Sequence, residues 1–160
     1  MKIGIADTTF ARVDMGGVAE RFIAQHPLGG RAVAVLRYTV PGFKDLAPEV
    51  KRLLTDDGCD IALALGWAGG EAIDERSAMI ADAGLMLVKV LTGKHVLAAF
   101  VHVEESRDDE EKLASICMNR VEGHAEHALM LLHDRAALNT LAGSGRRQGE
   151  ENVGAILSAL

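Results

Sequence analysis

Aromatic and polar side chains gather in four short runs of the sequence. The runs are residues 7–12, 41–45, 66–70 and 102–105. Four of the six Phe, Tyr and Trp residues lie in or beside them: Phe10, Tyr38, Phe43 and Trp67. Flat rings next to hydroxyl and charged groups suit a planar heterocycle with hydrogen-bonding edges and a polar tail. The alternative is that these aromatics cap a sheet and belong to the core.

His102 is the candidate for acid–base chemistry, because it lies where the last strand-like stretch meets its loop, with Glu104 nearby. The alternative is a hydrogen-bonded structural histidine. Lys44 and Asp45 offer a neighbouring charge pair in the second run. They are equally well explained as a surface pair combined with a helix cap.

Two groups of residues have the chemistry to bind a metal ion. His124 and His127 lie three apart, but no third ligand is evident, so an exposed helix face is the favoured interpretation. Glu71, Asp74 and Glu75 could also bind a metal, although acidic residues are common at helix starts. We therefore predict no protein-bound metal site and no organic cofactor, and we leave a role for Mg²⁺ open.

Several standard sites are missing from the sequence. The third run begins at Gly66 without the aspartate that a phosphoacceptor domain needs there. No GxGxxG or GxxxxGK[ST] motif is present, which excludes the usual dinucleotide and P-loop phosphate cradles. No GxSxG nucleophile elbow occurs either.

The elements that must position these runs alternate in type along the chain. Strand-like stretches are expected at residues 2–6, 31–39, 60–66 and 95–103. Helices are expected at residues 16–25, 45–54, 75–91 and from 106 to about 133, with a short helical stretch at 136–142. Asp45 is the expected N-cap of the second helix, and Ser106 opens a capping-box-like start for the fourth.

This alternation predicts an α/β fold with a parallel sheet covered by helices on both faces. We expect a flavodoxin-like, three-layer αβα domain with a four-stranded sheet in the order 2-1-3-4. Ligands bind such sheets beyond the carboxyl ends of the strands, where the four runs meet. The prediction covers residues 1–160 as one domain, with a glycine-rich tail at 143–160 that either orders around a ligand or partner or is flexible.

The third expected helix is apolar around almost its whole circumference. A helix of this kind must be buried on all sides, and a four-stranded sheet covers only one of them. We therefore predict a subunit interface there, rather than an unusually apolar core helix. The residues are Met79, Ile80, Leu85, Met86, Leu87, Val88, Val90 and Leu91.

Composition narrows the class of protein further. The net charge is −6 and no basic stripe is present, which argues against nucleic-acid binding. No apolar stretch approaches the ~20 residues that span a bilayer, and no signal peptide is recognisable. The two cysteines, Cys59 and Cys117, lie in no metal-binding or disulfide pattern, so we expect a soluble cytoplasmic protein with two buried thiols.

Five segments in order resemble the archaeal-type riboflavin synthases, a family related to lumazine synthase. They are residues 3–15, 40–46, 58–66, 94–102 and the run Arg147-Gln148-Gly149. The resemblance spans almost the whole chain. One departure is Trp67-Ala68-Gly69, where the family tends to carry Met-Pro-Gly.

The resemblance implies a transferase that converts two molecules of 6,7-dimethyl-8-ribityllumazine into riboflavin and 5-amino-6-(D-ribitylamino)uracil, the last step of riboflavin biosynthesis. It also implies a homopentamer with sites between neighbouring subunits. The alternatives are a lumazine synthase and a non-catalytic flavin- or lumazine-binding oligomer. A lumazine synthase usually carries a histidine after its third-strand glycines, whereas Glu71 follows Gly69-Gly70 here.

On this hypothesis each run has a task. We expect Phe10, Phe43 and Trp67 to frame the stacked rings. His102, with Glu104 nearby, would shuttle the proton of the reaction. The remaining substrate-binding candidates are Thr8, Thr9, Pro41, Lys44, Asp45 and Gly66.

Overall fold

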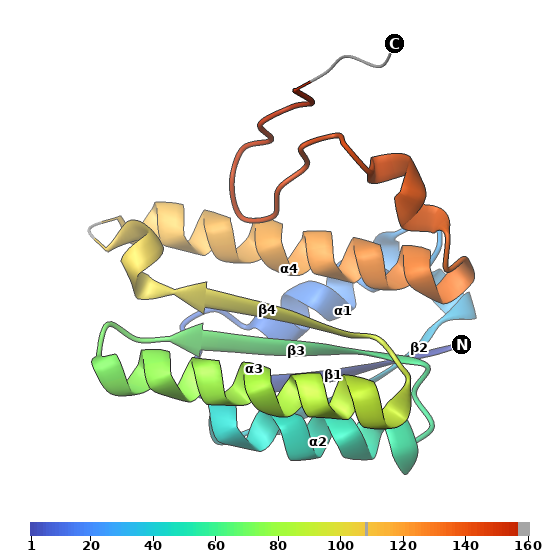
Figure 1. The fold of residues 1–160 in the computed structure, drawn as a ribbon, viewed down its shortest axis with the longest axis horizontal. Coiled ribbons are helices and arrows are strands. Elements are labelled where there is room, and N and C mark those ends of the chain that lie inside the picture. The colour runs from blue at the N-terminus through green and yellow to red at the C-terminus, as the bar shows by residue number, and fades with distance from the viewer. Residues whose placement is uncertain (108, 157–160) are drawn as a thin grey trace.

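The computed structural model describes residues 1–107 and 109–156. Four parallel strands form one sheet in the order β2-β1-β3-β4 (Figure 1). This confirms the predicted α/β fold and its strand order. The strands are β1 (Lys2–Thr8), β2 (Ala34–Val40), β3 (Ile61–Ala68) and β4 (Val96–His102).

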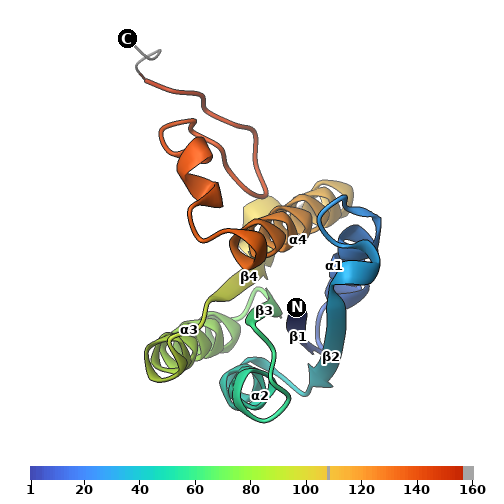
Figure 2. The same cartoon turned by 90° about the vertical axis from the view of Figure 1, so that its right-hand side faces the viewer.

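Two helices cover each face of the sheet, which gives the predicted three layers (Figure 2). On one face lie α1 (Met15–Gln25) and α4 (Glu110–His133). On the other lie α2 (Phe43–Thr55) and α3 (Ala72–Thr92). Short 3₁₀ turns are η1 (Gly30–Ala32), η2 (Val103–Ser106) and η3 (Ala137–Leu141).

The core has two parts, one on each side of β3. Every residue of β3 is buried, as expected for a strand covered on both faces. Leu63 and Leu65 pack towards α1 and α4, whereas Ala62 and Ala64 pack towards α2 and α3. The small alanines leave room for the large residues of α2, including Leu46 and Leu53.

Two of the predicted element starts near β2 and α2 are wrong. Arg31 belongs to η1, so β2 begins only at Ala34. Asp45 is not an N-cap, because α2 begins at Phe43 with Gly42 as its cap. The backbone N–H of Asp45 already donates to the carbonyl of Gly42 (3.1 Å). Phe43 is only 8% exposed, and its burial in the core accounts for the earlier start.

The starts of α3 and α4 also differ from the prediction. α3 begins at Ala72, one turn before the expected Glu75, which lies in its first turn. Ser106 does not open α4, because it closes the turn η2. The N-cap of α4 is Asp109, whose side chain accepts a hydrogen bond from the N–H of Lys112 (2.8 Å).

α3 leaves a wide apolar face open on the single chain. Its buried side consists of Ala78, Ala81, Leu85 and Val88. Seven further apolar residues are between 56% and 77% exposed, namely Ile73, Met79, Ile80, Met86, Leu87, Val90 and Leu91. Sheet and α2 therefore cover one side of this helix and leave the other uncovered.

The described part of the tail, residues 143–156, loops onto the outer side of α4, contacts it through Gln148 and Gly149, and then leads away from the sheet and its helices (Figures 1 and 2). Among residues 1–107 and 109–156, no helix combines the length and apolar character that a bilayer crossing needs.

Candidate active site at the carboxyl edge of the sheet

The carboxyl edge of the sheet is the edge where Thr8, Val40, Ala68 and His102 end their strands. All four predicted runs reach it, as the parallel topology requires. The side chains there are held by three sets of contacts, which join β1 to β2, β3 to α2, and β4 to α3.

A buried ion-pair cluster joins β1 to β2. Asp7 is 4% exposed, and Arg37 Nη2 lies 2.5 Å from its Oδ2. The hydroxyl of Thr39 donates to the other oxygen of Asp7 (2.7 Å). Arg37 Nη2 also contacts Asp14 Oδ1 at 2.6 Å. Asp7 therefore fixes the base of the first loop and is not available to a ligand.

The hydrogen bonds around Asp14 and Arg37 change the pKa of both groups. The backbone N–H of Gly17, followed by Arg37, lowers the pKa of Asp14 below its ordinary value. Burial acts to lower the pKa of Arg37, but the bonds to Asp7 and Asp14 raise it overall. Arg37 therefore stays charged under any condition in which the chain is folded.

The first loop is anchored at both sides and presents one open aromatic ring. Thr9 donates from its hydroxyl to the carbonyl of Pro41 (3.0 Å), which ties the first loop to the second. Arg12 pairs with Glu110 of α4 at 2.8 Å. Between them Phe10 is 58% exposed, next to Gly69 of the third loop. Phe10 is thus the predicted ring-framing residue that a ligand can reach on the single chain.

Phe43 and Trp67 fill the core instead of lining an open loop. Phe43 packs edge-on against Phe100, with ring centroids 4.8 Å apart. Trp67 lies within β3, 3% exposed, on the face covered by α1 and α4. Its indole Nε1 and the hydroxyl of Thr8 are both buried, and neither has a hydrogen-bond partner within residues 1–107 and 109–156. On the single chain these residues form the layer beneath the site.

Gly66 allows Phe43 to lie against the sheet, since a Cβ at this position would overlap the Phe43 ring. We expect Gly66→Ala to lower the free energy of unfolding by about 1–3 kcal/mol, the usual effect of overpacking a core. Urea denaturation measures this change. Gly70→Ala is the control, because its Cβ would make only ordinary contacts, at 3.8 Å or more. Equal denaturation midpoints for the two variants would contradict the close packing.

An imidazole–carboxylate pair joins β4 to α3. His102 Nδ1 lies 2.8 Å and 2.9 Å from the two oxygens of Glu75. A carboxylate only accepts hydrogen bonds, so Nδ1 carries the proton and Nε2 is the nitrogen that can accept one. The His102 side chain is 33% exposed. This geometry is that of a general base with an orienting carboxylate.

Glu75 is the partner of His102 in the structure, whereas the sequence analysis considered it only as a possible metal ligand or an acidic helix start. Glu104 pairs with Arg107 on the surface instead of with His102. The contact between Glu75 and His102 could have been inferred from the predicted topology, because α3 follows β3 and β4 is the next strand of the sheet. The first turn of α3 therefore lies beside the last residue of β4.

The remaining polar candidates are open to solvent. Lys44 and Asp45 are exposed in the first turn of α2, and Pro41 is exposed just before it. Thr9 is exposed beside them. Together with Phe10 they form an accessible rim around the buried layer.

The acidic residues expected as alternative metal ligands do not form such a site. Both oxygens of Glu75 face His102. Within residues 1–107 and 109–156, no three His, Cys, Asp or Glu side chains are grouped so as to hold a metal ion. On the single chain, the described side chains alone do not fit a magnesium site.

The exposed-face interpretation of His124 and His127 is wrong. His124 Nδ1 lies 2.7 Å from the carbonyl of Arg120, and His127 Nδ1 lies 2.7 Å from the side-chain nitrogen of Gln148 in the tail. Burial, the largest influence on each, lowers the pKa of both histidines. His127 thereby helps the tail to pack on α4, whereas His124 bonds within the helix.

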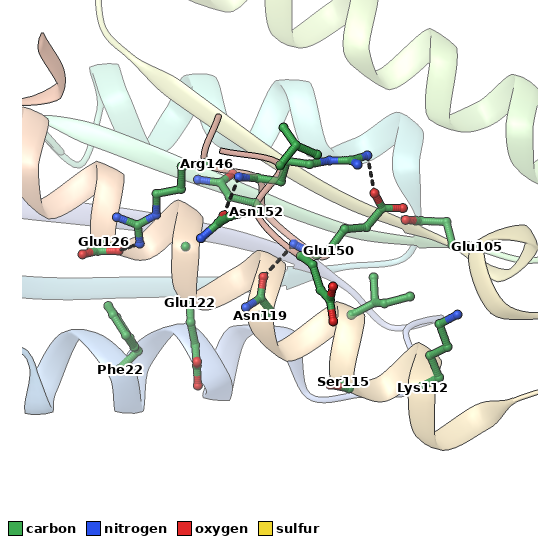
Figure 3. Close-up of a pocket in the computed structure, with 17 residues that line it drawn as sticks. Phe22, Glu105, Lys112, Ser115, Asn119, Glu122, Glu126, Arg146, Glu150 and Asn152 are labelled. Carbon is green, nitrogen blue, oxygen red and sulfur yellow. Dashed lines mark hydrogen bonds and ion pairs between the residues drawn. The ribbon is translucent and has the colours of Figure 1, made fainter. Parts of the chain in front are cut away.

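A cavity of about 960 Å³ lies between α4 and the tail (Figure 3). Arg146 of the tail points to Glu126 of α4, and Asn119 points to the tail backbone (Figure 3). Glu105 reaches this cavity from η2, whereas the predicted substrate-binding residues do not line it.

Comparisons with known proteins identify the family. No family model matches the chain. A riboflavin synthase from Archaeoglobus fulgidus is 43% identical over 157 residues, which is 98% of this chain and 99% of that protein. The enzymes of the same name from Methanothermobacter marburgensis and Aeropyrum pernix are 42% and 44% identical, over 96% of this chain and 98% and 97% of theirs. The chain belongs to the riboflavin synthase family.

Membership of the riboflavin synthase family agrees with the resemblance found in the sequence. A riboflavin synthase must bind its substrate and move protons. The exposed rim around Phe10 and the His102 imidazole have the chemistry for these two tasks. Phe10 on the rim and His102 beside Glu75 meet at one edge of the sheet.

Proposed function

We propose that this chain is a riboflavin synthase that transfers a four-carbon unit between two molecules of 6,7-dimethyl-8-ribityllumazine. Riboflavin and 5-amino-6-(D-ribitylamino)uracil are the products. The observation that carries the proposal is the His102–Glu75 pair at the same edge as the exposed Phe10 ring, in a chain of this family.

The first task of such an enzyme is to align two identical planar molecules. Holding both in register replaces an entropy cost of about 7–11 kcal/mol at the upper end. Phe10 offers one face to a ring, while Thr9, Lys44 and Asp45 offer hydrogen bonds to ring edges or ribityl hydroxyls. Thr8, Phe43, Gly66 and Trp67 shape the layer beneath, and Pro41 belongs to the exposed rim.

The second task is to remove a proton from a methyl group of one lumazine. The C–H bond breaks, its electron pair stays on the carbon, and the proton goes to Nε2 of His102. Glu75, on the other nitrogen, stabilises the imidazolium that forms. The carbanion then adds to a C=N carbon of the second lumazine, whose π electrons move to the ring nitrogen. Cleavage of the C–N bonds that held the four-carbon unit finally releases 5-amino-6-(D-ribitylamino)uracil. No organic cofactor takes part in this proposal.

Activity is tested by incubating the purified protein with dimethylribityllumazine alone and recording riboflavin absorbance. Riboflavin formation supports the proposal. Binding of the lumazine without turnover would favour the alternatives, a lumazine synthase or a non-catalytic binding oligomer, and would overturn it. Repeating the assay with EDTA, and then with added Mg²⁺, tests whether the ion contributes.

We further propose that the protein is a homopentamer in which the open face of α3 packs on a neighbouring chain. The apolar residues left exposed on α3 support an interface of this kind. The neighbour would complete the site, covering the rim around Phe10.

A charge on this face should disrupt the assembly. We expect Leu87→Glu, at a position 64% exposed, to reduce the particle mass seen by light scattering after size exclusion. The buried charge would have no partner in the interface, which is costly. Leu28→Glu, in the turn after α1, is the control and should leave the mass unchanged. A pentamer that survives Leu87→Glu would place the interface elsewhere.

The cytoplasm is the proposed location. Cys59 and Cys117 are buried and free, which supports a reducing compartment. Burial raises the pKa of the Cys117 thiol to about 11, so the group is unreactive.

A further inference from the structure

Arg120 of α4 links three parts of the molecule close to His102. Its Nη1 donates to the carbonyl of Phe100 in β4 (2.7 Å) and to Glu105 Oε1 (2.6 Å). Its Nη2 donates to Glu105 Oε2 (2.5 Å). The Arg120 and Glu105 side chains are only 15% and 22% exposed. This is a bidentate, partly buried pair, which fixes geometry as well as charge.

Glu105, which Arg120 holds in place, in turn holds the backbone of His102. Its Oε1 also accepts from the backbone N–H of His102 (2.9 Å). The last residue of β4 is thus held on its backbone by Glu105 and on its imidazole by Glu75. Burial acts to raise the pKa of Glu105, but the bonds from Arg120 and His102 lower it overall.

The tail closes on Arg120 from the other side. The backbone N–H of Gly149 donates to Asn119 Oδ1 (2.7 Å), and Gln148 bonds His127. Gly149 is buried with a φ of +89°, and a Cβ there would lie 2.6 Å from Arg120 Nη2. Only glycine fits between the tail backbone and the guanidinium without moving one of them.

We propose that Arg120 is a positioning residue for His102, and that the tail segment 146–149 holds Arg120 in place. Arg120 touches no reacting atom in this proposal. It acts through Glu105, which sets where the backbone of His102 lies relative to Glu75. The inference rests on the proposed role of His102 as general base.

The first test compares Arg120→Gln and Arg120→Lys with the wild-type protein in steady-state kinetics. A misplaced base should lower kcat by about 10- to 100-fold, while KM for the lumazine stays near the wild-type value. Lysine keeps the charge but lacks the bidentate fork, so it should restore little of the loss. Wild-type kcat in either variant would overturn the proposal.

The pH profile of kcat separates positioning from general damage. The charged groups around His102 are Glu75 from α3, Glu105 from η2 and, beyond it, Arg120 from α4. Arg120→Gln should move the limb of the pH profile that His102 sets. Arg52→Gln should not, because the Arg52 side chain is exposed and pairs with Glu49 on α2. Histidine-selective ¹⁵N NMR should show the same displacement of the His102 titration. If Arg120→Gln left both the pH profile of kcat and the His102 NMR titration unchanged, the proposal would be overturned.

The second test uses the tail and does not depend on replacing a buried charge. Gly149→Ala and Gly143→Ala introduce the same methyl group at positive φ, +89° and +78°, but no atom lies within 4 Å of a Cβ at Gly143. Gly149→Ala should lower kcat and move the His102 titration in the same direction as Arg120→Gln, and Gly143→Ala should do neither. Equal behaviour of the two variants would overturn the part assigned to the tail.

The NMR readout also separates this inference from the proposed function. If the wild-type protein formed no riboflavin, the proposed function would fail. A displaced His102 titration in Arg120→Gln and Gly149→Ala would still support the positioning. An undisturbed titration in a protein that does form riboflavin would overturn the positioning alone.

Discussion

His102→Ala should lower kcat for riboflavin formation by about 100- to 10,000-fold, the range that general base catalysis contributes. The imidazole Nε2 is the proton acceptor in the proposed reaction, and alanine leaves no replacement for it. The loss should appear in kcat and much less in KM, since His102 binds neither the rings nor the ribityl chains in this proposal. Stopped-flow or steady-state absorbance at the riboflavin band measures it.

Glu75→Gln distinguishes the general base from a structural histidine. Glutamine can accept a hydrogen bond from Nδ1 but carries no charge, so the imidazolium loses its stabilisation. We expect kcat to drop, but by less than in His102→Ala. Glu104→Gln, whose carboxylate pairs with Arg107, is the matched control. Full turnover in His102→Ala would falsify the proposed role.

The layers of this fold could be predicted from local pattern alone. β3 is a continuous apolar run, and both of its faces are buried as the run predicts. The apolar circumference of α3 likewise predicts its uncovered face. Helix starts could not be predicted as well, because they depend on distant partners. Asp45 has the residue type of an N-cap, yet the burial of Phe43 moves the start of α2 two residues earlier.

Part of the candidate site could likewise be predicted from the sequence, and part could not. Parallel topology places the four runs at one edge, and this could be read from the order of the elements. The partner of His102 could not, since Glu75 lies 27 residues away on another element and Glu104 is nearer in sequence. The sequence also did not show which of the aromatic side chains are exposed and which are buried. Phe10 is open and Trp67 is buried, although both follow a strand-like run, because β3 extends to Ala68.

Arg37→Met should lower the free energy of unfolding by about 3 kcal/mol, because it leaves the carboxylate of Asp7 buried without its cation. Asp7 retains the Thr39 hydroxyl, which does not compensate a charge. Gly16 makes the arrangement possible, since a Cβ there would overlap the Arg37 side chain. Urea denaturation, with the slope checked for two-state behaviour, measures the loss.

Two comparisons decide whether the buried charge is the cause. Arg12→Met breaks an exposed pair with Glu110 and should cost no more than about 1 kcal/mol. Asp7→Asn combined with Arg37→Met should recover part of the stability, because no unpaired charge then remains buried. Equal midpoints for the two single arginine variants would contradict the argument.

The pH dependence gives an independent check on the same cluster. The folded chain lowers the pKa of Asp14 below its ordinary value of 3.8, through the Gly17 N–H and then Arg37. A lowered carboxyl pKa contributes stability above the unfolded value, and that contribution is lost as the pH falls through the folded value. Without Arg37 the folded pKa of Asp14 moves back towards 3.8, so the variant should lose less stability below that pH than the wild-type protein. A steeper acid-induced loss in Arg37→Met than in the wild-type protein would show that Arg37 does not hold the Asp14 carboxylate in its charged form.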